Sequence, residues 1–297
     1  MALKEFKRIV VVHNPRSSQA RRVREEVIEK LPGAEMYEVV DTDVDDNAGR
    51  LAKVLEDGDL VVSAGGDATA TIGLNGAMLA GKDVSFAALP YGNFNDSARG
   101  LGLKKLEDAL NGETKKAWAL ECLIDGEHYR YGLCYFTAGM FAEATEIFDD
   151  PRYRKKLREK PSLVFSIRIL AEWWRGNRKK RFLPAKFLMN GQEVRGMTDY
   201  VALNSRSMAK AMRGKRWFLT HEFRSKVGRL SNFFGLSRMV GPSVVARVPG
   251  KESKGDVLEF ESQAEVMIQG EGEYKRIKVK KIEVRKAERW IRVVLAK

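Results

Sequence analysis

The sequence predicts an α/β protein with two domains: a parallel-sheet domain over residues 1–125 and an antiparallel β-rich domain over residues 126–297. Two observations predict it. Up to about residue 120, apolar runs without polar alternation are separated by helical patterns, which is typical of a parallel sheet covered on both faces. From Ser243 onward, short alternating segments are joined by glycine-bearing turns, which is typical of antiparallel strands. A chain of 297 residues is long enough for both domains.

The elements of the first domain follow from local patterns. β-branched and apolar runs predict strands, whereas a 3.6-residue apolar period or helical charge pattern predicts helices. The predicted strands are Arg8–His13, 35–40, 60–63 and 84–89, and the predicted helices are 16–30, 45–56 and 70–80.

The second domain is predicted to consist mainly of strands. These are residues 129–138, 199–204, 244–248, 256–261, 264–269, 276–284 and 289–296. The last of them is compatible with either domain, so it can return to the first sheet. An exposed edge strand in this half would also allow a homodimer.

Net charge and cysteine content narrow the classes of function. The chain has 53 lysines and arginines against 40 aspartates and glutamates, and this net charge of +13 favours polyanionic partners such as nucleotides, anionic lipids or nucleic acid. Because no helix-turn-helix, zinc-finger or aromatic–basic RNA motif is present, we expect no nucleic-acid partner. Cys122 and Cys134 have no metal-binding spacing and suit a reducing cytoplasm.

The basic segment 150–182 has two interpretations. It contains an amphipathic stretch over residues 162–174 that ends on Trp173 and Trp174. Either it is a helix packed on its own domain with a solvated basic flank, or it contacts an anionic membrane surface. The first residues show no signal peptide, and no apolar run reaches the ~20 residues that span a bilayer. We therefore expect a cytoplasmic protein, peripheral at the membrane in the second interpretation.

Three polar turns follow strands of the predicted parallel sheet: HNPRSS at 13–18, SAGGDAT at 63–69 and LPYGNFND at 89–96. Ligands of such sheets bind beyond the carboxyl ends of the strands. Glycines let a ligand approach the backbone, and the start of a following helix attracts anions. We therefore expect these turns to hold phosphate.

Asp67 is unexpected beside phosphate, because its carboxylate would repel the ligand. Coordination of Mg²⁺ or acceptance of a hydroxyl proton would explain it. The structural alternative is that Asp67 or Thr69 caps the following helix and binds nothing.

Together the turns resemble the catalytic-domain motifs of the diacylglycerol kinase and sphingosine kinase family, which includes bacterial soluble lipid kinases. HNPRSS, GGDAT with Asn75-Gly76, and PYGNFNDSARGL resemble NPxSG, GGDGTxNEVxNG and PxGTxNDFAR in the same order. The segment IQGEGE at 268–273 resembles the family's QxDGE. NAD kinases share the phosphate-binding scaffold more distantly.

The resemblance implies a nucleotide-binding domain, a substrate domain and an active cleft between them. It implies ATP as phosphoryl donor, Mg²⁺ as cofactor and a diacylglycerol- or sphingoid-like lipid alcohol as acceptor. It places the proton acceptor at Asp67 or Glu273, and the metal at Asp96 and Asp125. The positions that it assigns to the nucleotide are Asn14, Ser17, Gly65, Gly66, Asp67, Thr69, Gly92, Asn93, Asn95 and Asp96.

The chain also departs from the family patterns. The bulkier or less polar replacements are Ala68, Ile72, Phe94, Phe141 and Val227. Losing one ligand or transition-state contact costs roughly 10–1000-fold in rate without removing the fold. Two hypotheses therefore remain: an active lipid kinase, and a catalytically impaired relative that binds nucleotide, lipid or a regulatory partner. A NAD-kinase-like enzyme with a soluble substrate is a third.

Overall fold

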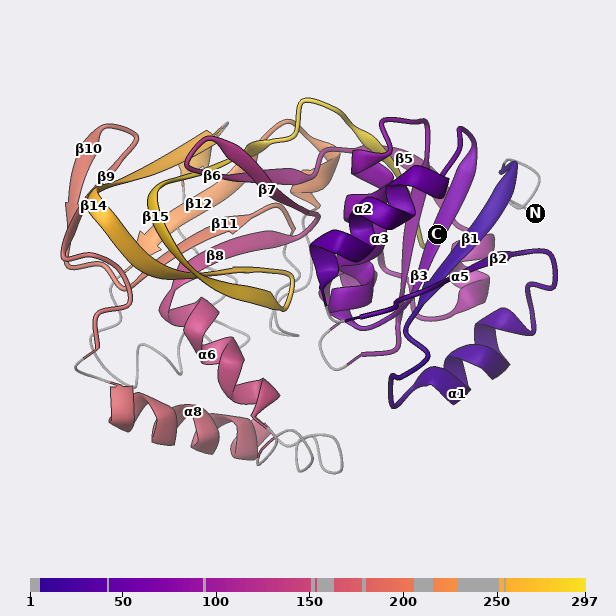
Figure 1. Cartoon of the computed structure of the whole chain (residues 1–297), viewed down its shortest axis with the longest axis horizontal. Helices are drawn as coiled ribbons and strands as arrows, with labels where there is room; N and C mark the ends of the chain where they lie inside the picture. The colour runs from indigo at the N-terminus through magenta and orange to yellow at the C-terminus, as the bar shows by residue number, and fades with distance from the viewer. Residues whose placement is uncertain are drawn as a thin grey trace.

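In a computed structural model the chain forms two sheets that lie side by side (Figure 1). The structure describes residues 6–41, 43–92, 95–150, 153, 163–177, 180–205, 216–228, 251–253 and 255–297. Sheet A is mostly parallel and sheet B is antiparallel, which confirms the predicted fold class.

Sheet A combines strands from both ends of the chain. Its strands are β1 (Arg8–His13), β2 (Glu35–Glu38), β3 (Asp59–Gly65), β4 (Ser85–Pro90), β5 (Glu113–Ala117) and β16 (Ile291–Leu295). They are ordered β2-β1-β3-β4-β16-β5, and all neighbours are parallel except β16 and β5. β3 is buried along its whole length, as expected for a strand covered on both faces. The last strand of the chain thus lies in the N-terminal sheet.

Sheet B contains the described strands between residues 120 and 286. They are β6 (Leu120–Ile124), β7 (Glu127–Gly132), β8 (Tyr135–Gly139), β9 (Lys186–Met189), β10 (Gln192–Arg195), β11 (Asp199–Leu203), β12 (Phe223–Gly228), β13 (Lys251–Ser253), β14 (Gly255–Gly270) and β15 (Glu273–Lys286). The main order is β13-β12-β11-β8-β14-β15-β6-β7. β14 and β15 form a long hairpin whose turn reaches sheet A's helices.

The helices position the first sheet's turns. They are α1 (Ala20–Val23), which continues as the π-helical segment η2 (Arg24–Ile28), then α2 (Val44–Val54), α3 (Asp67–Leu79), α4 (Asp96–Leu101), α5 (Leu106–Leu110), α6 (Met140–Asp149) and α8 (Leu163–Asn177), with the 3₁₀ turn η3 (Trp217–Leu219). α3 lies between sheet A and strand β7 (Figure 1) and packs against α2. Gly76 permits this packing, because a Cβ there would lie 2.6 Å from the Leu51 side chain.

Two sequence predictions of single elements are wrong. Residues 129–138 were expected to form one strand, yet the chain bends at Leu133 and Cys134 and forms β7 and β8, which have different neighbours in sheet B. Conversely, the segments 256–261 and 264–269 are one strand, β14, with a register shift between Glu259 and Ala264. A bulge interrupts the alternation of side chains, and the strand was therefore predicted as two.

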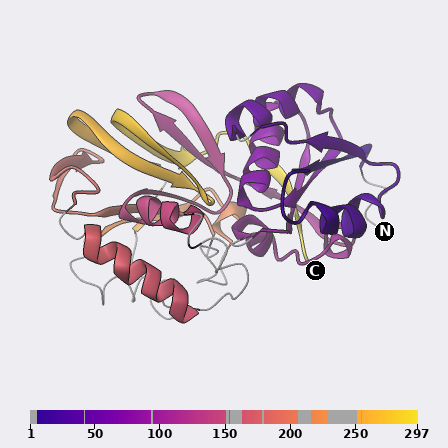
Figure 2. The ribbon, with the colours of Figure 1, turned by 60° about the horizontal axis from the view of Figure 1, so that its bottom comes forward.

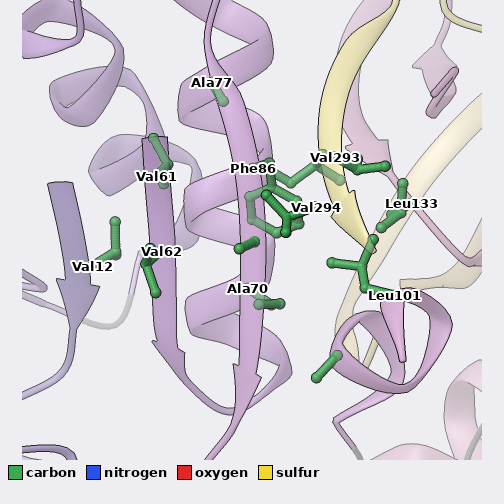
Figure 3. Close-up of a cluster of buried hydrophobic side chains, with 14 of the residues drawn as sticks. Val12, Val61, Val62, Ala70, Ala77, Phe86, Leu101, Leu133, Val293 and Val294 are labelled. Carbon is green, nitrogen blue, oxygen red and sulfur yellow. The ribbon is translucent and has the colours of Figure 1, made fainter. Parts of the chain in front are cut away.

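The apolar core of sheet A extends into the second half of the chain, while sheet B has a second core of its own. The cluster formed by β1, β3, β4 and α3 also contains Leu133, Val201, Leu203 and Phe218, which come from the second half of the chain. Figure 3 shows Leu133 in the same cluster as Val293 and Leu101. Because this interface is apolar and continuous with the core, it fixes the two halves more firmly than a polar domain contact would.

Helices α6 and α8 pack together beside sheet B (Figure 2). α8 matches the amphipathic stretch expected at 162–174, whereas much of the basic segment 150–182 lies outside the described residues. In the described part of the chain, every helix is too short or too polar to cross a bilayer.

Candidate functional site

The three glycine-bearing turns meet at one edge of sheet A. His13 pairs with Ala64, Ala64 pairs with Leu89, and Gly65 pairs with Pro90. The strands β1, β3 and β4 therefore end at the same level, because parallel neighbours share their carboxyl edge. The turns after His13, Gly65 and Pro90 are thereby brought together, as expected from the sequence.

Two of the turns touch through glycines. The Cβ that an alanine would place on Gly92 would overlap the Cα of Gly66. The Asn95 side chain closes the second turn, since its Oδ1 accepts from the Gly92 N–H at 2.7 Å and its Nδ2 donates to the Gly92 carbonyl at 2.7 Å. Asn95 itself has a φ of 56°, a left-handed conformation that asparagine tolerates better than most residues.

Replacing Gly92 by alanine is expected to force these turns apart. The clash falls on backbone atoms, which cannot rotate away as a side chain would, so we expect a loss of about 1–3 kcal/mol in the free energy of unfolding. Urea unfolding measures it. The control is Gly33→Ala, because a Cβ on Gly33 meets nothing within 4 Å. Equal stability of both variants would contradict the contact.

Asp67 begins α3 and is held by the start of α4. Its Oδ1 accepts from the Asp96 N–H at 2.7 Å, and its Oδ2 accepts from the Asn95 N–H at 2.9 Å. The residue is 9% exposed. Burial, together with the neighbouring Asp96 carboxylate, raises the pKa of Asp67 to about 8, although the two amide donors oppose the shift. The carboxyl group of Asp67 thus occupies the anion-attracting start of α4.

Asp96 is the second buried carboxyl group and is 1% exposed. Arg99 donates to its Oδ1, and the Tyr135 hydroxyl donates to its Oδ2 at 3.1 Å. Tyr135 belongs to β8 and also accepts from Gln269 of β14, at 3.4 Å. Asp96 is therefore linked directly to sheet B.

The turn of the β14–β15 hairpin packs against Asp67. Gly270 and Glu273 pair across a two-residue turn, whose residues Glu271 and Gly272 have φ values of 51° and 90°. Two positive φ angles are characteristic of a type I′ hairpin turn. A Cβ on Gly272 would lie 3.0 Å from the Asp67 Cβ. The hairpin thus brings Glu273, which is half-buried, to the edge of sheet A that carries Asp67.

Glu271 is a third buried carboxyl group, and the sequence did not indicate it as a site residue. It is 1% exposed and accepts hydrogen bonds from the Ser97 hydroxyl and the Cys134 N–H. Burial raises the pKa of Glu271 to about 7, while the Ser97 bond lowers it. The available signal was its place at the aspartate position of the QxDGE-like motif.

The part of the chain that carries the three turns is similar to a known domain. Residues 8–134, which contain the three turns, match the diacylglycerol kinase catalytic domain. This confirms the resemblance that the three motifs predict, and such a domain implies a nucleotide substrate and usually a divalent metal.

Solved structures share the fold of the whole chain. A candidate diacylglycerol kinase from Bacillus anthracis strain Sterne is 14% identical, with a TM-score of 0.68 and 98% coverage of both chains. A structure described as a diacylglycerol kinase from the same strain is 13% identical, with a TM-score of 0.68, covering 98% of this chain and 97% of that one. At these identities the likeness shows the fold alone. No protein of curated function matches the sequence.

The remaining residues that the sequence suggests for the nucleotide lie around the same edge. Asn14 Oδ1 accepts from the Arg16 N–H at 2.9 Å, and Ser17 Oγ accepts from the Gln19 N–H at 3.2 Å, so both side chains shape the first turn. Thr69 is buried in the first turn of α3 and packs against Gly65. Asn93 lies outside the described residues, as does Phe94.

Asp125 does not lie at this site. It is exposed on the turn between β6 and β7, where its Oδ1 accepts from the N–H groups of Lys280 and Lys281 at 2.9 and 2.7 Å. Lys280 is seven residues along β15 from Glu273, or roughly 23 Å at the usual rise of a strand. The prediction that Asp125 is a metal ligand of this site is therefore corrected. Its carboxylate instead holds the turn between β6 and β7 against β15.

A metal ion does not fit the carboxyl groups as they are arranged. Each oxygen of Asp67, Asp96 and Glu271 already accepts a hydrogen bond from a protein donor. Within the described ranges, no group of three or more histidine, cysteine, aspartate or glutamate side chains is placed to hold a metal. Mg²⁺ prefers several oxygen ligands in near-octahedral geometry, and the described residues bring no such group of side chains together.

The replacements in the family motifs contribute mainly to packing. Ile72 is in the core, and Ala68 and Phe141 pack against the same cluster. Val227, on β12, packs against the core of sheet B. Their apolar side chains are therefore explained by burial.

Asn75 of the Asn75-Gly76 motif joins α3 to sheet B. Its Oδ1 accepts from the Tyr131 N–H at 2.7 Å, while its Nδ2 donates to the Tyr131 carbonyl at 2.9 Å. The amide thus pairs with the edge of β7 as a neighbouring strand would. Nearby, Arg130 of β7 forms a 2.7 Å ion pair with Asp45 of α2.

A cavity of about 410 Å³ lies away from this site. It is lined by the carboxyl end of α3 and by residues that precede β4 and begin β16, among them Met78, Lys82 and Trp290. These positions are at the amino edge of sheet A, opposite the three turns. Three of its cationic side chains have partners: Lys82 donates to the Leu55 carbonyl, Arg289 donates to the Lys82 carbonyl, and Arg292 pairs with Asp83.

Proposed function

We propose that this protein is a lipid kinase, which transfers the γ-phosphoryl group of ATP to the hydroxyl of a diacylglycerol- or sphingoid-like lipid. The observation that supports it most is the meeting of three glycine-bearing turns at one edge of sheet A, within residues that match the diacylglycerol kinase catalytic domain. Phosphoryl transfer depends on positioning and on neutralising charge, which fixed turns of this kind can supply.

The nucleotide phosphates would lie along the turns at the carboxyl edge. Gly66 and Gly92 leave the backbone accessible and Gly65 makes room for Thr69, while Asn14, Ser17 and Asn95 hold the turns in shape. We propose that Mg²⁺ accompanies the nucleotide, because the described carboxylates form no metal site of their own.

Of the two candidate proton acceptors, we favour Glu273. Asp67 is buried, and both of its oxygens accept backbone amides. Glu273 is half-buried at the first position of β15, beside the turn that covers Asp67. An acceptor must come within about 3 Å of the lipid hydroxyl, which a partly exposed residue can do more readily than a buried one.

A second function has specific support. Because the three buried carboxyl groups are all engaged by protein donors, a catalytically impaired relative that only binds nucleotide would retain the same arrangement. The test is ATP consumption with Mg²⁺ and a panel of lipid alcohols, next to a separate measurement of ATP binding. Consumption that requires one lipid supports the kinase, whereas binding without consumption by any lipid supports the impaired relative.

A further inference from the structure

The three buried carboxyl groups connect the two sheets. Asp67 and Asp96 belong to α3 and α4 beside sheet A, whereas Glu271 belongs to the turn of the β14–β15 hairpin of sheet B. Within the cluster, two hydrogen bonds between side chains cross from one half to the other: Tyr135 of β8 donates to Asp96, and Ser97 of α4 donates to Glu271. The cluster therefore lies where the two sheets meet.

The donors in this cluster come from the protein, and each is placed by its own element. The start of α4 supplies the Asn95 and Asp96 amides to Asp67, and Arg99, one turn further on, donates to Asp96. The bend before β8 supplies the Cys134 amide to Glu271. All six carboxyl oxygens are satisfied in this way, and leaving any of them unpaired in the interior would be costly.

We propose that Asp67, Asp96 and Glu271 form a metal-independent carboxyl joint that holds the two sheets together, with Tyr135 and Ser97 as its positioning residues. Asp96, to which the resemblance assigns a metal, acts here as an acceptor for protein donors. The joint does not depend on the proposed function, because it would be present in an active kinase and in an impaired relative alike.

The joint also explains the bend between β7 and β8. If residues 129–138 continued as one strand, the Cys134 amide would enter the ladder of sheet B and Glu271 would lose a donor. The bend turns that amide toward Glu271 and directs Tyr135 to Asp96. The hydrogen bonds to Glu271 and Asp96 thus stabilise the short irregular segment between β7 and β8.

Thermal unfolding of Tyr135→Phe, compared with Tyr129→Phe, tests the joint. Both tyrosines are largely buried in sheet B, but the Tyr129 hydroxyl has no hydrogen-bond partner among the described residues. We expect Tyr135→Phe to lower the unfolding midpoint by roughly 2–8 °C, because it removes the hydrogen bond from Tyr135 to the buried Asp96 carboxyl group, and Tyr129→Phe to leave it unchanged or raise it. Equal midpoints for the two variants would overturn the proposal. If Tyr135→Phe does not fold, Ser97→Ala is measured instead, with the same expectation.

Metal independence is tested on the wild-type chain without nucleotide. We expect the unfolding midpoint to be the same in EDTA, in 5–10 mM Mg²⁺ and in Mn²⁺, concentrations on the order of those that saturate ordinary protein sites. A saturable increase with metal that disappears in Asp96→Asn would overturn the proposal. An increase that persists in Asp96→Asn and Glu271→Gln would place the metal elsewhere, and the joint would stand.

Discussion

Glu273→Gln is expected to reduce lipid phosphorylation by roughly 10²–10⁴-fold, the range usually supplied by a positioned acid or base. The glutamine keeps the size of the side chain but cannot accept the hydroxyl proton. Because Glu273 is half-buried and outside the carboxyl joint, the unfolding midpoint should change little. Initial rates at saturating ATP, combined with a thermal unfolding curve, measure both quantities.

The matched control for this variant is Glu127→Gln, an exposed glutamate on β7. It changes the net charge by the same amount without touching the edge of sheet A. If Glu273→Gln retained the rate of the control, Glu273 could not be the proton acceptor, and Asp67 would be the remaining candidate.

Asp67→Asn is expected to lower both stability and turnover. Both Asp67 oxygens accept backbone N–H groups, and a carboxyl oxygen can do so with or without a proton. An asparagine NH₂ cannot, so one amide of α4 loses its acceptor, at a cost of about 1–3 kcal/mol. The start of α4 carries the turn that faces Gly66, and a displacement of about 1 Å there would cost on the order of 10²-fold in rate. Urea unfolding and initial rates check the two effects.

Glu271→Gln should behave differently from Asp67→Asn. One of its donors is the Ser97 hydroxyl, which can rotate and accept from the glutamine NH₂. The folded-state pKa of Glu271 is raised from 4.5 to about 7, so its contribution to stability is fully present below pH 4.5 and is lost as the pH rises through about 7. We therefore expect the variant to match the wild type near pH 5 and to exceed it near pH 8. A variant that is less stable than the wild type at both values would contradict this assignment.

Most of sheet A could be predicted from the sequence. Most of Arg8–His13 and the apolar runs that became β3 and β4 are buried, and this burial favours apolar residues, so the strands are visible as nearly continuous apolar segments. The turns that follow were visible for a related reason, because glycine is retained where two backbones touch, as Gly66 and Gly92 do.

The residues that form the carboxyl joint could not be predicted from the sequence in the same way. Glu271 and Glu273 both belong to the QxDGE-like motif, and the sequence does not show that Glu271 has a positive φ and is the buried one of the two. Asp125 was misplaced because the end of β6 was expected at the junction of the domains, whereas the hairpin directs it away from Asp67. The partners Tyr135 and Ser97 come from distant parts of the chain, and no local pattern indicates such pairs.

The most direct measurement of the central claim is the fate of the γ-phosphoryl group. ATP labelled at that position would be incubated with the wild-type chain, Mg²⁺ and mixed micelles that contain diacylglycerol or a sphingoid base, and the lipid fraction would then be extracted. We expect label in the lipid fraction with the wild type and no label there with Glu273→Gln. Saturable binding of ATP with label remaining on the nucleotide, or passing only to water, for every lipid alcohol would contradict it.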